Sequence, residues 1–173
     1  MLRREYDTQV CSVARSLEVV GERWSLLIVR SVLIGVRRFD HLQHALGVTR
    51  SVLTDRLKRL EAEGVIERRQ YHERPARYEY HLTPKGRELW PVIHHLMDWG
   101  DRHYPNPSGP PTVVTHRDCG GHVSADLHCD RCDATVRPGQ VRVAPGPGYD
   151  PERSGTWAHV TPGAGEPRAV GRG

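Results

Sequence analysis

The spacing of apolar residues changes at Gly64, and this change limits the folds open to the chain. Before Gly64, apolar side chains recur every three to four residues, which is the repeat of an α-helix. After Gly64 they alternate with polar ones, which is the repeat of a strand with one buried face. The sequence therefore predicts a mainly α domain with a small β-ribbon, an α+β fold.

Four short helices are predicted before this change. Val13, Leu17 and Val20 mark one face of the first, which Gly21 ends. The second, residues 24–33, is apolar on nearly all sides and is expected at the centre of the core. The third covers residues 39–46 and the fourth residues 50–63, with Gly47 and Gly64 as their stops and Thr49 as the N-cap of the fourth.

A ribbon and a long helix follow. Residues 65–71 and 76–82 are predicted strands, joined by a turn at 72–75 that contains Pro75. Thr83 and Pro84 have the residue types of an N-cap and a first helical position, so one helix is expected over 84–103. Pro91 lies inside that helix and predicts a kink or a break there.

This order of elements is that of a winged helix-turn-helix, with residues 50–63 as the recognition helix for the DNA major groove. At 100° per residue, Leu53, Leu57 and Leu60 share one face and form the predicted buried seam. The other faces carry donors for bases and phosphates. The predicted DNA-binding residues of this helix are Arg50, Ser51, Thr54, Asp55, Lys58 and Arg59.

The ribbon adds Arg68, Arg69, Arg74 and Arg77, and arginines at such a wing suit the DNA minor groove or its flanking phosphates. All of the net charge of +4 lies before residue 105, with 18 basic and 14 acidic residues there against 7 and 7 after it. A helix-ribbon domain can also dock on a protein or on another nucleic acid, and this alternative stays open.

Composition predicts four parts. The winged helix-turn-helix domain covers residues 1–104, a Pro-rich linker covers 105–111, and a small β module covers 112–144. In residues 144–173, 12 of 30 residues are Gly or Pro, so residues 145–173 are expected to form a disordered tail. Trp157 is the one large apolar residue of that tail that could dock on the rest.

The small module carries a metal-ligand pattern. His116 and Cys119 form one close pair, and Cys129 and Cys132 form a second. Two such pairs on separate turns are how a zinc ribbon builds a tetrahedral site, and thiolates with imidazole favour zinc. The four residues are therefore predicted to hold a structural zinc ion; the alternative is a ribbon that keeps its strands without metal.

Other classes of protein fit less well. No apolar run is long enough to span a membrane and the first residues do not form a secretory signal, so a cytoplasmic protein is expected. Zinc deaminases need a Glu two residues after the first metal ligand, where this chain has Asp118. The chain is therefore not expected to be an enzyme. His94, His95 and His103 are interpreted as packed or solvated rather than as ligands.

Residues 11–100 resemble the HxlR-type winged-helix regulators, a branch of the MarR-like group. The residues that carry the resemblance are Gly21, Trp24, Leu26, Leu27, Ile28, Gly35, Arg38, Phe39, Leu42, Leu46, Gly47, Val48, Thr49, Leu53, Thr54, Leu57, Leu60, Glu61, Gly64, Val65, Ile66, Arg68, Tyr71, Pro75, Tyr78, Tyr80, Leu82, Thr83, Gly86, Leu89, Pro91, Trp99 and Gly100.

The resemblance implies a cytoplasmic transcriptional regulator that binds a pseudo-palindromic operator in double-stranded DNA as a homodimer. Dimer contacts would come from residues 11–20 and 84–103, and the two recognition helices would lie about 34 Å apart, one turn of DNA. Some relatives carry a redox-sensing cysteine near the first helix, which makes Cys11 a candidate redox site. Nothing in the sequence identifies a small-molecule effector.

Overall fold

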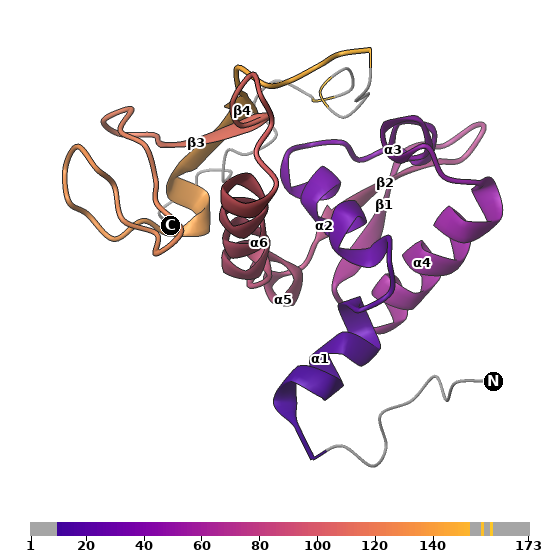
Figure 1. The fold of residues 1–173 in the computed structure, drawn as a ribbon. Helices are drawn as coiled ribbons and strands as arrows, with labels where there is room; N and C mark the ends of the chain where they lie inside the picture. The colour runs from indigo at the N-terminus through magenta and orange to yellow at the C-terminus, as the bar shows by residue number, and fades with distance from the viewer. Residues whose placement is uncertain (1–9, 153–156, 158–159, 161–173) are drawn as a thin grey trace, which may run out of the picture.

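The computed structural model describes residues 10–152, Trp157 and Val160, which form a helical unit and a ribbon unit packed on each other (Figure 1). The helical unit begins with α1 (Ser12–Val20), α2 (Ser25–Leu33), α3 (Phe39–Leu46) and α4 (Arg50–Ala62). The four helices agree with the predicted ones to within one residue at nearly every end. Ile28 and Val29 of α2 are fully buried, so α2 is central, as its apolar sequence predicts.

The helix boundaries follow from local chemistry. Gly47 ends α3 in the left-handed conformation, with φ of 62°, which costs little without a Cβ. The hydroxyl of Thr49 then accepts a hydrogen bond from the Val52 N–H at 3.4 Å and caps α4. After Gly64, the N–H of Val65 donates to the Leu60 carbonyl at 2.9 Å and closes the last turn of α4.

The wing consists of β1 (Ile66–His72) and β2 (Arg77–Leu82), which pair antiparallel with Ile66 opposite Leu82. Both strands begin one residue later than predicted. Val65 is the reason for the first shift, because its N–H belongs to the end of α4. Its carbonyl accepts the N–H of Thr83, so Val65 links the end of the recognition helix to the base of the wing.

The predicted single helix over 84–103 is two helices, α5 (Pro84–Arg87) and α6 (Trp90–His103). Thr83 caps α5 as predicted, since its hydroxyl accepts the Gly86 N–H at 3.1 Å. The break comes before Trp90 rather than at Pro91. Pro91 lies in the first turn of α6, where a missing N–H removes no helical hydrogen bond, and this explains the shifted position of the break.

The ribbon unit pairs β3 (Thr112–His116) with β4 (Val141–Pro145), and a short 3₁₀ turn, Pro138–Gln140, precedes β4. Regular backbone pairing continues beyond residue 144, where the sequence predicts that the disordered tail begins. The N–H groups of Gly146 and Gly148 donate to the carbonyls of Pro111 and Pro110 at 3.0 and 3.1 Å. The first residues of the predicted disordered tail are therefore paired with the predicted linker, and most of the tail lies outside the described residues.

Helix α6 joins the two units. One side of it adds Ile93 to the core of the helical unit. Another side adds Trp90 to the core of the ribbon unit, where it packs with Val114, Val123, Cys129, Val136 and Val141. Leu33 and Met97 contact both cores. The two units therefore share one continuous apolar interior around α6.

Leu57→Ala is expected to lower the free energy of unfolding by about 2–5 kcal/mol, because it leaves a cavity in a close-packed core. Leu57 is only 2% exposed and lies in the main apolar cluster. Chemical denaturation followed by circular dichroism measures the change. Lys58→Ala, one residue along on the exposed face, should change stability by no more than about 0.5 kcal/mol. Equal losses for both variants would contradict this assignment of the helix faces.

Candidate nucleic-acid interface and metal centre

Helix α4 buries one face and leaves the other uncovered. Leu53, Leu57 and Leu60 are buried as predicted, and Ser51, Asp55 and Lys58 are exposed on the opposite side. Figure 1 shows α4 at one end of the molecule, beside the wing. The open face begins at the N-terminus of α4, where unpaired backbone N–H groups favour phosphate.

Some predicted DNA-binding side chains of α4 already have contacts. The guanidinium of Arg50 lies over the ring of Phe39, 4.9 Å from its centroid, and Arg59 pairs with Glu63 at 3.3 Å. The hydroxyl of Thr54 donates to the Arg50 carbonyl at 2.8 Å. Lys58 has no ion pair within residues 10–152 and is the cation of α4 most available to a phosphate.

The arginines of the wing also divide into those that already have contacts and those that form no ion pair with any described residue. Arg69 pairs with Glu67, and Arg68 lies over the ring of Tyr78, 4.4 Å from its centroid. Arg74 and Arg77, near the turn, are exposed and form no ion pair with any described residue. The turn of the wing therefore presents two guanidinium groups that form no ion pair with any described residue.

Arg38 is a residue of this surface that the sequence analysis used only for the family resemblance. It precedes α3, stacks over the ring of Tyr71 at 4.6 Å and pairs with Glu79 at 3.3 Å. It therefore fixes both strands of the wing against the start of α3. Its spacing from the wing in sequence, about 40 residues, gave no signal of this contact.

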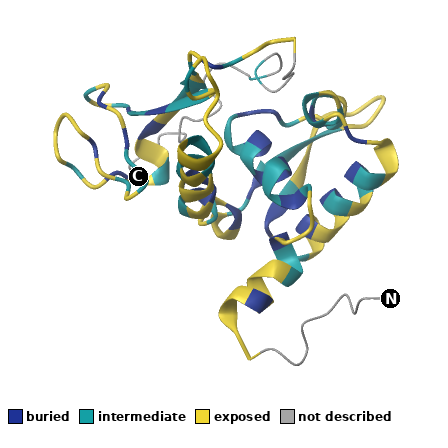
Figure 2. Cartoon of the chain, viewed as in Figure 1, coloured by how far each residue is buried: buried dark blue, intermediate teal, exposed yellow. Residues whose placement is uncertain are grey.

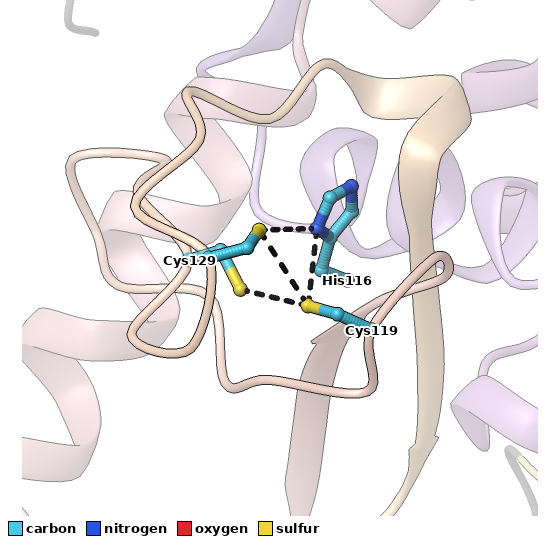
Figure 3. Close-up of side chains that lie close together, drawn as sticks. His116, Cys119 and Cys129 are labelled. Carbon is cyan, nitrogen blue, oxygen red and sulfur yellow. Dashed lines mark hydrogen bonds between the residues drawn. The ribbon is translucent and has the colours of Figure 1, made fainter.

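The structure brings together the four predicted metal ligands. Figure 3 labels three of them, His116, Cys119 and Cys129. His116 ends β3, Cys119 follows in the next turn, and Cys129 and Cys132 lie on a second turn. The Nδ1 atom of His116 lies 3.3 Å from Cys132 Sγ and 3.4 Å from Cys119 Sγ. Cys119 Sγ lies 3.3 Å from Cys129 Sγ and 3.6 Å from Cys132 Sγ.

These distances fit a tetrahedral ion. Bonds of about 2.3 Å to sulfur and about 2.0 Å to nitrogen place the ligand atoms of a tetrahedron about 3.5–3.8 Å apart. The four ligand atoms lie within 4.8 Å of one another. The four distances given above, 3.3–3.6 Å, are equal to or slightly shorter than the spacing expected for a tetrahedral ion. The outer nitrogen of His116, Nε2, lies 3.5 Å from an Asp118 oxygen without forming a hydrogen bond, and Nδ1 is the nitrogen that faces the thiols of Cys119 and Cys132.

The surroundings of Cys129 favour its thiolate. Burial by itself raises the pKa of this thiol, but the backbone N–H groups of Arg131 and Cys132 and the neighbouring thiols lower it to about 6. Amides that point at sulfur are what the Cys-x-x-Cys spacing provides. The cluster is thus able to hold a divalent metal ion. His122 and His128 lie outside it.

The other residues considered from the sequence include two histidines of α6 and Cys11, and a ring nitrogen of each histidine lies near a backbone carbonyl. His94 is buried, and its Nε2 lies 2.8 Å from the Ser124 carbonyl of the ribbon unit. His95 Nδ1 lies 2.9 Å from the Pro91 carbonyl of its own helix. Cys11 precedes α1, is exposed, and makes no side-chain capping bond.

Among the described residues, no helix has both the length and the apolar character needed to cross a bilayer.

Comparison with known proteins adds to this geometry. Residues 19–108 match the family described as HxlR-like helix-turn-helix. The chain belongs to the HxlR-like family. The match spans α2 to α6 and so includes the recognition helix, the wing and the helix that carries the ribbon unit.

Relatives extend the likeness beyond the helical unit. The chain is 45% identical over 138 residues to the HTH-type transcriptional regulator Rv3095 of Mycobacterium tuberculosis, covering 80% of this chain and 87% of that one. Among solved structures, PA1607 has a TM-score of 0.63 with 32% identity, over 80% of this chain and 97% of that one. The redox regulator HypR, in its oxidised form, has a TM-score of 0.51 with 33% identity, over 54% and 97%.

The fold, the family and the exposed face of α4 all indicate the same class of protein. This HxlR-like protein is a DNA-binding transcriptional regulator with a winged helix-turn-helix.

Proposed function

We propose that this HxlR-like regulator binds a pseudo-palindromic operator as a homodimer, with α4 in the major groove and the turn of the wing at the minor groove. The observation that carries the proposal is the uncovered face of α4 with its unpaired Lys58, beside the unpaired Arg74 and Arg77 of the wing. These cations suit phosphates and base edges. Arg50, Ser51, Thr54, Asp55, Arg59, Arg68 and Arg69 complete the proposed surface.

Exposed apolar side chains support the homodimer. Val13 and Leu17 of α1 are 65% and 41% exposed, and Leu96 and Trp99 of α6 are 50% and 49% exposed. Figure 2 shows α1 projecting from the body with most of its surface open. Exposed apolar residues on these two helices are what a two-fold interface would bury. A second copy of the chain is therefore the proposed partner of this surface.

Lys58→Ala and Arg77→Ala are each expected to weaken binding to operator DNA by about tenfold or more, because each removes a cation that contacts the duplex. Fluorescence anisotropy against the DNA upstream of the protein's own gene measures affinity at two salt concentrations. The slope of affinity against salt should also fall for Lys58→Ala.

Arg142→Ala is the matched control, since Arg142 is an exposed arginine of β4 in the ribbon unit. It should bind operator like the unchanged protein. Salt-sensitive binding that prefers operator over scrambled DNA would support the regulator. Binding that ignores both salt and sequence, or equal losses in all three variants, would favour a protein-docking module instead.

Leu96→Glu is expected to convert the homodimer to a monomer, since a charge would replace an apolar contact at the centre of the interface. Analytical ultracentrifugation should give twice the chain mass of 19.6 kDa for the unchanged protein and the chain mass for the variant. Gly139→Glu adds the same charge to the ribbon unit, where a new Cβ has nothing within 4 Å. A dimeric Leu96→Glu protein would contradict this interface.

We propose in addition that His116, Cys119, Cys129 and Cys132 hold a structural zinc ion. The support is their ligand set and their tetrahedral spacing. Zinc would tie the two turns of the ribbon unit together, and with all four positions taken by protein it would leave none open for catalysis. A regulatory and not a catalytic role is proposed for the whole chain, which we place in the cytoplasm with its DNA.

Purified protein is expected to contain about one zinc ion per chain, and Cys132→Ser should lose it because three ligands hold the ion much less tightly. Metal content by mass spectrometry and the melting temperature with and without chelator measure the effect. Cys11→Ser removes a cysteine outside the cluster and should keep the ion. Metal-free protein whose melting is insensitive to added zinc would support the metal-independent ribbon.

Redox sensing by Cys11 stays a prediction. The structure adds that this thiol is exposed directly before α1 and one turn from Arg15.

A further inference from the structure

A cavity of about 450 Å³ lies where the helical unit meets the ribbon unit. Its walls come from α2, α6, β4 and the segment after β4. This volume is within the range of sites that hold small organic molecules. The cavity is separate from the exposed face of α4 and from the cluster of His116 and the three cysteines, and none of those residues lines it.

Three aromatic side chains line the cavity: Trp90, Tyr149 and Trp157. The ring of Trp90 is fixed, because it is 3% exposed and stacks on His94 with centroids 5.1 Å apart. Leu33 and Met97 add aliphatic surface. Flat aromatic walls with aliphatic neighbours favour a planar, largely apolar molecule.

The charged residues of the cavity indicate the charge of that molecule. The described lining of the cavity includes the charged side chains of Arg30, Asp101 and Asp150, of which Arg30 and Asp150 already have partners within the protein. Asp101 forms no ion pair with any described residue. A molecule with one positive charge would pair with Asp101, and the faces of the tryptophan and tyrosine rings also attract cations.

We propose that this cavity binds a planar aromatic molecule that carries a single positive charge, such as a protonated amine or N-heterocycle. The aromatic walls would stack on its ring system, and Asp101 of α6 would pair with its charge. Burial, and then the neighbouring Asp98, raises the pKa of Asp101, because both disfavour its ionised form. A cationic molecule beside Asp101 would favour the ionised form.

The proposed molecule would contact both units at once. Trp90 and Asp101 lie on α6, whereas Val143 and Tyr149 belong to the ribbon side. Its binding would therefore hold the ribbon unit against α6 and stabilise the whole fold. The binding of such a molecule does not depend on how the chain binds DNA.

Calorimetric titration of the full-length protein tests the proposal with three probes of one size. The first probe, 9-aminoacridine, is a tricyclic cation. The second, anthracene-9-carboxylate, is an anion, and the third, 9-anthracenemethanol, is neutral. The cation is expected to bind at least about tenfold more tightly than the other two, because only it gains the ion pair and the cation–π contacts. Equal affinity for all three, or no binding of the cation, would overturn the proposal.

Two variants locate the site. Asp101→Asn keeps the shape of the side chain and removes its charge, and Trp157→Ala removes one aromatic wall; each should weaken 9-aminoacridine binding by about tenfold. Asp126→Asn, at an exposed position of the ribbon unit outside the cavity, is the control and should bind normally. Circular dichroism melting shows whether each variant is folded. Folded variants that both bind with unchanged affinity would place the molecule elsewhere and refute this site.

Discussion

The packing of Trp90 between two units is the contact on which the rest of this structure depends. The other buried members of the ribbon core are valines and one cysteine, so among the described residues the indole is the largest side chain buried in it. The same helix places Ile93 in the core of the helical unit. A ribbon of about 35 residues buries too little apolar surface to fold alone, and α6 supplies what is missing.

This contact separates the functions of the molecule in space. Helix α4 and the wing lie at one end, the ribbon unit lies at the other, and α6 runs between them (Figure 1). The ribbon unit therefore does not share the surface that we propose binds DNA. It contacts instead the helix whose exposed side is the proposed dimer interface.

Much of the helical unit could be predicted because its signals are local. Gly47, Thr49 and Thr83 stand where a helix needs a stop or a cap, and each does so in the structure. The leucines of α4 share a face by the geometry of the helix itself. The metal cluster was predictable for the same reason, since close pairs of ligands need only two tight turns to meet. Pro91 is the exception: the sequence predicts it inside one long helix, but it lies in the first turn of α6, where proline does not break a helix.

The sequence by itself determined the order of the elements, the buried seam of the recognition helix and the identity of the ligand cluster. Each of these depends on residues within about fifteen positions of one another. Only the tertiary structure decided that Trp90 and His94 serve the ribbon unit, while Leu96 and Trp99 stay exposed. It also decided that residues 146 and 148 pair with the linker and that Arg38 supports the wing. An apolar stripe predicts that a surface will be buried. The partner that buries it is set by contacts between residues far apart in the chain, and periodicity carries no information about those contacts.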